Sequence, residues 1–336
     1  MAYRNPRYDS ASDEIGYNLR KRKVKIVCAI LAFIIAVVCA ALVYARFVEP
    51  RRLVTKEQDY KSDTLEFGEN NDCLRLAIFA DTHFSDYYTV KDFKKAADAI
   101  NNAKPDMILF LGDLVDNLSE YKGDTGEISE LLAALKAPYG KYAVYGNHDY
   151  GGDMQFEYEK IMEDGGFKTL VNESVSVDDS NIVIHGIDDM LIGYGDVTSA
   201  KSLDDDDYNI VLCHEPDVAD KMINYNINLI LSGHTHGRQI NLRIFDRLVL
   251  PTYGKKYVKG AFSLVYDKEL NQVIVDSSSG EKGETGFDTG SLDASGLDGV
   301  DNSDPLELYV SGGLGMSKIN MRFMSPPEVN IIDIKN

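Results

Sequence analysis

Five short polar segments of this sequence carry residue types that can bind metals or move protons. Four of them hold five of the six histidines, and the fifth holds two aspartates. Each segment comes directly after an apolar run typical of a β-strand. The segments are Asp81-Thr82-His83, Gly112-Asp113-Leu114-Val115-Asp116-Asn117, Gly146-Asn147-His148-Asp149, Cys213-His214-Glu215 and Gly233-His234-Thr235-His236-Gly237.

These segments predict a shared metal site. The carboxyl ends of parallel strands open onto one crevice, so residues far apart in the sequence can meet there. Residues i and i+2 of an extended chain point the same way, which lets Asp81 and His83 reach one cluster. Mixed oxygen and nitrogen donors suit Mn²⁺, Fe²⁺, Zn²⁺, Co²⁺ or Ni²⁺, and define this class of ion rather than one metal. His185 lacks the flanking pattern, so we predict a structural role for it.

The elements that position these segments alternate between strand-like and helix-like patterns. Strand-like runs occupy 74–80, 107–111, 141–145, 182–185, 210–213 and 229–231, with helical or amphipathic segments at 90–102, 128–135 and 218–225. This alternation predicts a largely parallel sheet covered by helices. The runs at 261–266, 272–275, 306–310 and 329–334 have no helical segments between them and predict a second sheet. We therefore expect an α/β sandwich of two mixed sheets flanked by helices.

The N-terminal region predicts a membrane anchor. Residues 26–44 contain no charged side chain and would span about 28 Å as a helix, close to the ~30 Å hydrocarbon thickness. We expect a basic cytoplasmic tail at 1–25, a transmembrane helix at 26–45, a stalk or entry segment at 46–73 and the catalytic domain at 74–336. More basic residues precede the helix than follow it, which favours an extracytoplasmic domain on a single-pass membrane protein. A cleaved signal peptide is the alternative.

The amino-acid composition limits which binding partners and cysteine-based structures we expect. The formal net charge of −19 argues against duplex nucleic acid, whose phosphates require a basic surface. The four cysteines show no zinc-site or disulfide spacing, and we interpret them as small apolar residues. Residues 277–305 are rich in Ser, Gly and Asp and predict a disordered loop, with an acidic Ca²⁺-binding loop as the alternative.

The five segments, in this order, resemble those of the calcineurin-like metallophosphoesterase superfamily. The match covers about residues 74–250. Tyr309-Val310-Ser311-Gly312-Gly313-Leu314-Gly315 and Arg322-Phe323, followed by Pro326-Pro327-Glu328, resemble a bacterial, membrane-anchored branch similar to UDP-2,3-diacylglucosamine hydrolases. Asn117 replaces the Arg of protein phosphatases in this superfamily, which weakens a protein-phosphatase interpretation, and Asp149 replaces a common Glu.

The resemblance implies a role for each matching residue. One metal would be held by Asp81, His83, Asp113 and His236, and a second by Asp113, Asn147, His214 and His234. His148 would contact the phosphate or protonate the leaving group, and Asp116 would orient His148. Arg238 either contacts substrate or is a surface arginine.

The ligand set implies hydrolysis of a phosphodiester, pyrophosphate or phosphomonoester by a hydroxide that bridges two metal ions. The anchor favours a lipid-linked or cell-envelope substrate near the membrane. Two alternatives stay open: a non-catalytic metal-binding scaffold or receptor of the envelope, and a nucleotide phosphodiesterase. Turnover of chromogenic phosphoesters with added Mn²⁺ distinguishes the scaffold from an enzyme.

Overall fold

The computed structural model describes residues 6–67, 73–242, 246, 250–267, 272–276, 280–282 and 305–336. The chain divides into two units, Met1–Val48 and Glu49–Asn336. We call the second unit the catalytic unit. The predicted loop at 277–305 lies outside the described residues except for 280–282 and 305.

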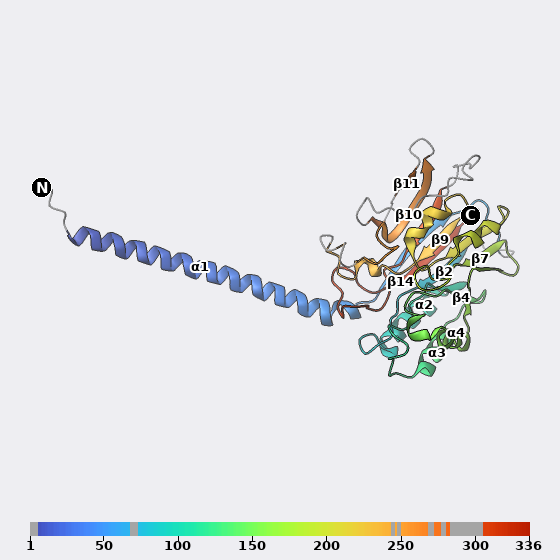
Figure 1. Cartoon of the computed structure of the whole chain (residues 1–336), viewed down its shortest axis with the longest axis horizontal. Helices are drawn as coiled ribbons and strands as arrows, with labels where there is room; N and C mark the ends of the chain where they lie inside the picture. The colour runs from blue at the N-terminus through green and yellow to red at the C-terminus, as the bar shows by residue number, and fades with distance from the viewer. Residues whose placement is uncertain are drawn as a thin grey trace. The chain divides into compact units, whose positions relative to one another are not determined.

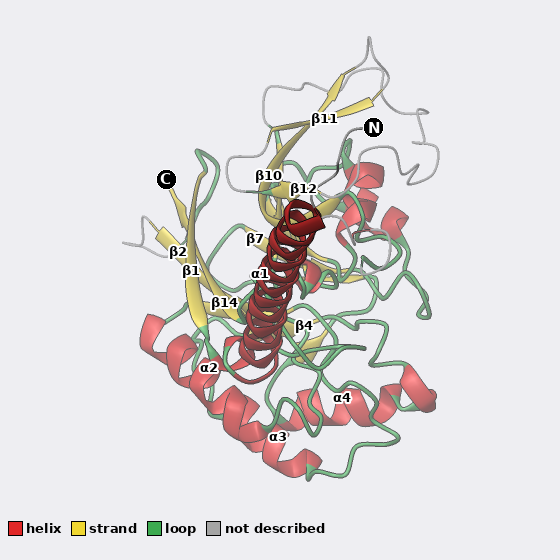
Figure 2. Cartoon of the chain, turned by 90° about the vertical axis from the view of Figure 1, so that its left-hand side faces the viewer, coloured by secondary structure: helices red, strands yellow, loops and turns green. Residues whose placement is uncertain are grey.

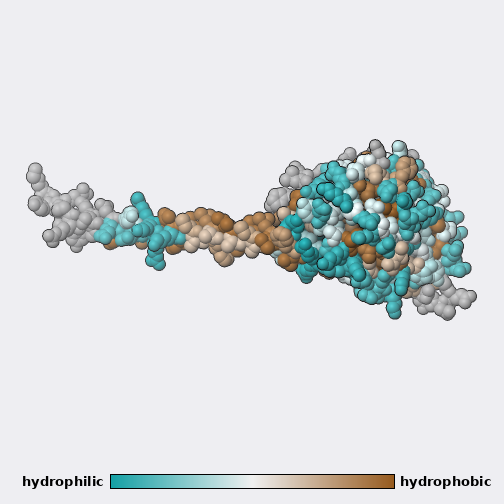
Figure 3. Space-filling view, turned by 90° about the horizontal axis from the view of Figure 1, so that it is seen from below, coloured by the Kyte–Doolittle hydropathy of each residue, from teal (hydrophilic) through white to brown (hydrophobic). Residues whose placement is uncertain are grey.

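The first unit is dominated by one long helix, α1 (Pro6–Phe47). It includes the predicted segment 26–45 and begins about five and a half turns before the apolar run. Figure 3 shows a continuous apolar band along this helix, and side chains such as Ile30 and Phe33 are exposed. By length and composition the helix can cross a membrane, a test that a signal sequence also passes.

The first sheet of the catalytic unit has the strand order β1-β14-β2-β3-β4-β5. Its strands are parallel except at the β14–β2 pair. Helices α2, α3 and α4 gather beside this sheet (Figures 1 and 2). The bounds are β1 (Val54–Lys61), β2 (Cys73–Phe79), β3 (Met107–Phe110), β4 (Lys141–Ala143), β5 (Lys168–Thr169), β14 (Glu328–Lys335), α2 (Val90–Ala103), α3 (Thr125–Ala133) and α4 (Gln155–Asp164).

The second sheet has the order β11-β10-β13-β9-β8-β7-β6, and β12 pairs with β10. Its strands are β6 (Glu173–Ser176), β7 (Ile182–Gly186), β8 (Tyr208–Leu212), β9 (Leu229–Ser232), β10 (Tyr257–Asp267), β11 (Gln272–Asp276), β12 (Glu281–Lys282) and β13 (Leu306–Val310). Short 3₁₀ helices complete the unit: η1 (Glu49–Arg51), η2 (Gly151–Asp153), η3 (Val197–Ser202), η4 (Pro216–Met222) and η5 (His236–Arg238).

Alternation along β2 explains how the layers pack. Leu74, Leu76 and Ile78 join residues of β7, β8 and β9 in a core between the two sheets. Ala77 and Phe79 point the other way and join residues of α2, α3 and α4 in a second core. Successive strand residues face opposite sides, so one strand serves both cores. The unit is the predicted sandwich of two mixed sheets with flanking helices.

Helix α2 shows local signals that agree with its packing. Thr89 and Asp92 form a capping box, and Lys104 ends the helix in a left-handed conformation. Phe93, Ala96, Ala97 and Ile100 are buried at helical spacing.

The sheets are divided differently from our expectation. Strand β14 belongs to the first sheet, whereas β6 to β9 join β10, β11 and β13 in the second. Within the predicted stalk, Val54–Lys61 forms edge strand β1, paired with β14. The helix expected near 218–225 is the 3₁₀ helix η4.

Candidate metal centre

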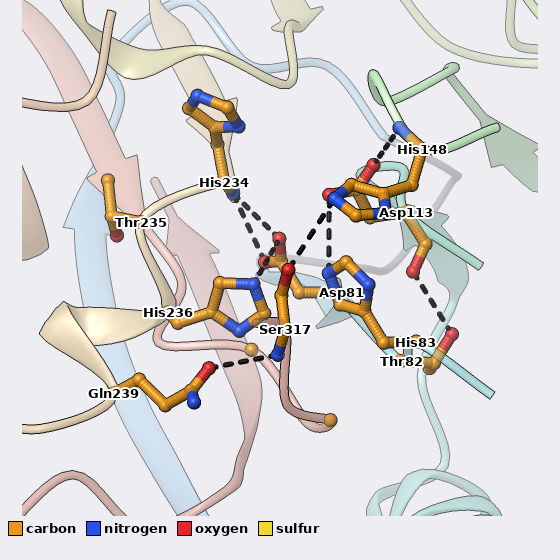
Figure 4. A network of polar contacts seen from close by, with 12 residues as sticks. Asp81, Thr82, His83, Asp113, His148, His234, Thr235, His236, Gln239 and Ser317 are labelled. Carbon is orange, nitrogen blue, oxygen red and sulfur yellow. Dashed lines mark hydrogen bonds and ion pairs between the residues drawn. The ribbon is translucent and has the colours of Figure 1, made fainter. Parts of the chain in front are cut away.

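All seven predicted metal ligands lie just after strands of the two sheets. Asp81, His83, Asp113 and Asn147 follow β2, β3 and β4 of the first sheet, and His214, His234 and His236 follow β8 and β9 of the second. Figure 4 shows several of these side chains gathered in one space. The crevice is thus built from strand ends of both sheets, and not of one sheet as the sequence pattern implied.

Asp113 lies at the centre of the cluster. His83 Nε2 and His214 Nε2 each lie 3.3 Å from Asp113 Oδ2, and all three side chains are almost fully buried. His236 Nε2 lies 3.7 Å from Asp81 Oδ1. Two groups of donors form around Asp113, one with Asp81, His83 and His236 and one with His214 and His234. Within each group the donor atoms lie within 4.8 Å of one another.

Several buried donor atoms in this cluster have no hydrogen-bond partner among the described residues: His83 Nε2, His214 Nε2, His236 Nδ1 and Asn147 Oδ1. A buried polar atom without a partner is costly and rare in native structures. Metal coordination would satisfy such atoms, so the side chains fit two divalent cations.

Hydrogen bonds on the far side of two histidines fix which nitrogen faces the cluster. His214 Nδ1 donates to the carbonyl of Leu111 at 2.5 Å, and His234 Nε2 donates to the carbonyl of Thr252 at 2.9 Å. In the neutral rings, His214 Nε2 and His234 Nδ1 therefore carry the lone pairs. Metal-binding histidines commonly use such second partners to set ring orientation.

The charges of the cluster also favour a bound cation. Burial raises the pKa of Asp81 to about 6. Burial alone would lower the pKa of His83, but its contacts with Asp113 and Asp116 raise it to about 9. The carboxylates of Asp113 and Asp116 thus favour a proton on His83, whereas burial lowers the pKa of His234 to about 3. A divalent cation would supply the same positive charge.

Backbone strain concentrates at the predicted ligands. Asp81, His83, Asp113, His234 and His236 all have φ between 42° and 72°, which is unusual for residues other than glycine. Gly112 has a φ of 93°, and a Cβ there would lie 2.8 Å from His214 Nδ1. Glycine therefore allows the β3 loop to approach the β8 loop.

His148 lies beside the cluster with a quarter of its side chain exposed. Its Nδ1 donates to the main-chain carbonyl of Asp116 at 2.6 Å, and its Nε2 lies 3.5 Å from Ser317 Oγ. The carboxylate of Asp116 instead accepts from His83 Nδ1 at 3.1 Å, whereas its Oδ1 is 3.6 Å from His148 Nδ1. The carbonyl of Asp116, rather than the predicted carboxylate, makes the hydrogen bond that orients His148.

Arg238 is paired with two carboxylates beside the metal centre. The residue is buried, and its Nε and Nη2 donate to Asp246 while Nη1 donates to Glu281. It is therefore not a surface arginine. Arg238 also lines the cavity, and its contact with substrate stays a prediction. The pairing with Glu281 could not be predicted from a local pattern, because Glu281 lies 43 residues away.

The structure adds Arg322 to the residues that shape the site. Its guanidinium is fully buried and donates to the carbonyls of Gly312, Gly315 and Ser325. It also lies 3.5 Å from the carbonyl of His236. Arg322 thus fixes the loop between β13 and β14 against a predicted ligand. The resemblance marked its segment but assigned it no role.

Asp149 joins two of the site's loops, the one after β3 and the one after β4. Its carboxylate accepts the backbone N–H groups of Asp113, Leu114 and Gly146 at 2.8 Å each. These bonds explain why an acidic residue follows His148. His185, by contrast, bonds Ser174 and Ser199, and burial lowers its pKa to about 4, as a structural histidine would show.

A cavity of about 260 Å³ opens over the cluster. Its polar wall includes Asp113, Asn147, His148, His234 and His236, and its other walls include Leu191, Ile240, Pro251, Lys318 and Ile319. Lys318 is exposed and makes no ion pair among the described residues. The cavity can therefore receive an anion.

Comparison with known proteins agrees with this geometry. The family model for the calcineurin-like phosphoesterase matches residues 74–238. The metallophosphoesterase YkuE of Bacillus subtilis is 36% identical over 87% of this chain and 89% of its own length. The chain belongs to the calcineurin-like metallophosphoesterase family. This metallophosphoesterase is accordingly a hydrolase of phosphoric esters. Its buried cluster of metal-binding side chains agrees with the two divalent metals that the family typically binds.

Two further relatives have names that describe a substrate or a membrane location. A UDP-2,3-diacylglucosamine pyrophosphatase, LpxG of Chlamydia muridarum, is 25% identical over 90% of this chain and 95% of its own length. A zebrafish (Danio rerio) transmembrane protein with a metallophosphoesterase domain is 28% identical over 70% of this chain and 56% of its own length.

Proposed function

We propose that this metallophosphoesterase hydrolyses a phosphodiester, pyrophosphate or phosphomonoester of a lipid-linked or cell-envelope substrate. The observation that carries the chemistry is the set of buried, unpartnered donor atoms around Asp113. LpxG, whose name includes a diacylated sugar nucleotide, supports the lipid-linked class.

Two divalent cations would be held by the chain's own side chains. Asp81, His83, Asp113 and His236 would hold one, and Asp113, Asn147, His214 and His234 the other, with Asp113 shared. When bound, such ions activate water and neutralise charge on the phosphoryl oxygens. Mn²⁺, Fe²⁺, Zn²⁺, Co²⁺ and Ni²⁺ all suit these donors.

His148 would act as the general acid. The carbonyl of Asp116 accepts from Nδ1, so the imidazolium form directs its Nε2–H into the cavity. As water adds to phosphorus and the bond to the leaving oxygen breaks, Nε2 would give its proton to that oxygen. Lys318, on the same cavity wall, would meet an anionic part of the substrate.

The apolar band of α1 supports a single-pass anchor, and the basic residues before it support an extracytoplasmic catalytic unit. This location would keep the catalytic unit within reach of membrane substrates, since Glu49 follows the helix almost directly.

The first test uses the full chain in lipid nanodiscs with two soluble chromogenic esters, bis(p-nitrophenyl) phosphate and p-nitrophenyl phosphate. We expect turnover of at least one with added Mn²⁺, loss of turnover after chelation, and recovery when metal returns. No turnover of either ester with any of the five metals would favour the scaffold. Preference for cyclic or linear dinucleotides over lipid-linked pyrophosphates would favour the nucleotide phosphodiesterase.

A further inference from the structure

The loop 190–194, between β7 and η3, exposes an unusual amount of apolar surface. Among the described residues, nine large apolar side chains of the catalytic unit are exposed, and Leu191, Ile192 and Tyr194 are three of them. Their exposed fractions are 38%, 59% and 83%. Clustered apolar exposure of this kind is typical of ligand or membrane contacts rather than of an ordinary surface.

This loop is continuous with the catalytic cavity. Leu191 lines the cavity, and so does Ile319, which is 42% exposed and comes from the loop between β13 and β14. Ile240 and Pro251 add apolar surface to the same walls. The apolar rim, defined here as Leu191, Ile192, Tyr194 and Ile319, therefore combines the exposed loop with the cavity wall.

Buried carboxylates hold the loop in its exposed shape. Asp189 Oδ2 accepts the N–H groups of Ile192 at 2.5 Å and Gly193 at 2.8 Å. Asp188 accepts the N–H of Tyr194 at 2.8 Å and the hydroxyl of Tyr150 at 2.7 Å. Both aspartates are fully buried. The backbone is thus fixed while its apolar side chains project outward, as a preorganised binding surface requires.

The chemistry of the cavity identifies the occupant. The polar wall of the cavity carries the proposed metal ligands and His148, which would meet a phosphoryl group. Lys318 offers a positive charge, and the rim offers apolar contact. A nucleotide or a sugar phosphate alone would leave the rim in water. A phosphoester joined to a hydrocarbon chain would match all three parts.

We propose that the apolar rim binds the hydrocarbon chain of an amphiphilic phosphoester while its phosphoryl group occupies the metal centre. This inference rests on the proposed function and adds the surface that selects the substrate. The hydrocarbon chain of the substrate enters over Leu191 and Ile319. Ile192 and Tyr194 cover the part of this hydrocarbon chain that lies outside the cavity.

The test compares p-nitrophenyl ethyl phosphate with p-nitrophenyl dodecyl phosphate, which share the leaving group and differ in chain length. The full chain is held in lipid nanodiscs, with both esters below the concentration at which they aggregate. We expect kcat/KM for the dodecyl ester to exceed that for the ethyl ester by about tenfold or more, as burial of several methylene groups implies.

The variant Leu191→Ser/Ile192→Ser/Tyr194→Ser should lose most of this preference, measured within each variant as the ratio of kcat/KM for the dodecyl ester to kcat/KM for the ethyl ester. The control variant Phe156→Ser/Val171→Ser removes two exposed apolar side chains that do not line the cavity, and it should keep the preference. Because all five side chains are exposed, these variants should fold. Partition of the dodecyl ester into the nanodisc affects every variant equally.

Binding separates this proposal from the proposed function. Dodecylphosphonate and ethylphosphonate contain no hydrolysable ester, and calorimetry measures their binding even to a chain without turnover. Stronger binding of dodecylphosphonate that the loop variant loses supports the rim, and absent turnover would then contradict the proposed function alone.

Equal binding and equal turnover of both chain lengths in the wild type would overturn the rim. So would a preference that the loop variant retains. A changed oligomeric state of the variant with unchanged chain-length preference would assign the loop to a second copy, and also overturn it.

Discussion

Asp113 contacts both histidine groups of the metal centre, since His83 and His214 each lie 3.3 Å from the same oxygen. We expect Asp113→Asn to lose most bound metal and more than about 100-fold in kcat/KM, the scale of losing a key electrostatic group. Elemental analysis and turnover of bis(p-nitrophenyl) phosphate measure both effects. Asp204→Asn, in an exposed acidic run, is the matched control. Full metal content with normal turnover in Asp113→Asn would contradict the shared-ligand assignment.

His148 should matter for proton transfer rather than for metal binding, because its Nε2 contacts the cavity and not the donor groups. His148→Ala should keep its metal and lose about 10²–10⁴-fold in kcat on esters with poor leaving groups. Esters with good leaving groups should lose much less. A series of aryl phosphodiesters with different leaving-group pKa values measures this. An equal loss across the series would rule out the general-acid role.

Asp116 offers a test between two interpretations of one residue. Asp116→Ala removes the carboxylate that bonds His83 but keeps the carbonyl that bonds His148. We expect metal affinity to fall by about 10–100-fold, as for other partners of metal-bound histidines. Dependence on leaving-group pKa should not change. The opposite result, with normal metal titration and a steeper leaving-group dependence, would return Asp116 to the role that the resemblance implied.

Residue patterns predicted the donors better than their partners. Histidine, aspartate and asparagine after apolar runs were visible in the sequence. The structure brings six of the seven into two donor groups, and Asn147 lines the same cavity. The partner of Arg238 and the target of the Asp116 carboxylate were not visible. Both depend on how separate loops meet, and neither spacing nor residue type contains that information.

At the scale of elements, strands could be predicted from apolar runs, but their assignment to sheets could not. Strand β14 comes at the end of a series of strands, yet it pairs with β1 and β2. Strand β9 pairs in parallel with β13, although β10, β11 and β12 lie between them in the sequence. Long-range pairing depends on which faces bury together, and a local pattern does not record it.

The loop between β13 and β14 depends on one buried cation. Arg322→Lys cannot reproduce the hydrogen bonds to Gly312, Gly315 and Ser325. We expect the free energy of unfolding to fall by about 3 kcal/mol, since buried carbonyls lose charged partners. Metal affinity should also fall, because the loop contacts His236. Chemical denaturation and metal titration measure the two effects.

Arg52→Lys, at an exposed position, is the control for Arg322→Lys. Unchanged stability of the Arg322 variant would show that water or a neighbouring group replaces the lost hydrogen bonds.

At the scale of the whole molecule, the proposed anchor and the basic residues before it predict on which side of the membrane catalysis occurs. A protease added to intact cells should degrade the catalytic unit and leave a fragment that contains α1 in the membrane. A cytoplasmic protein of the same cells is the internal control and should stay intact. Protection of the catalytic unit until the membrane is permeabilised would place it in the cytoplasm instead.

Strand β14 also determines when the first sheet can be completed during protein synthesis. Translation delivers β2, β3 and β4 early, but β14 pairs with both β1 and β2 and comes from residues 328–335. Until residues 328–335 have been synthesised, the first sheet of the nascent chain therefore lacks an inner strand. Because β2 leads directly to Asp81 and His83, we expect a chain truncated before Glu328 to lack an ordered metal centre and phosphoesterase activity.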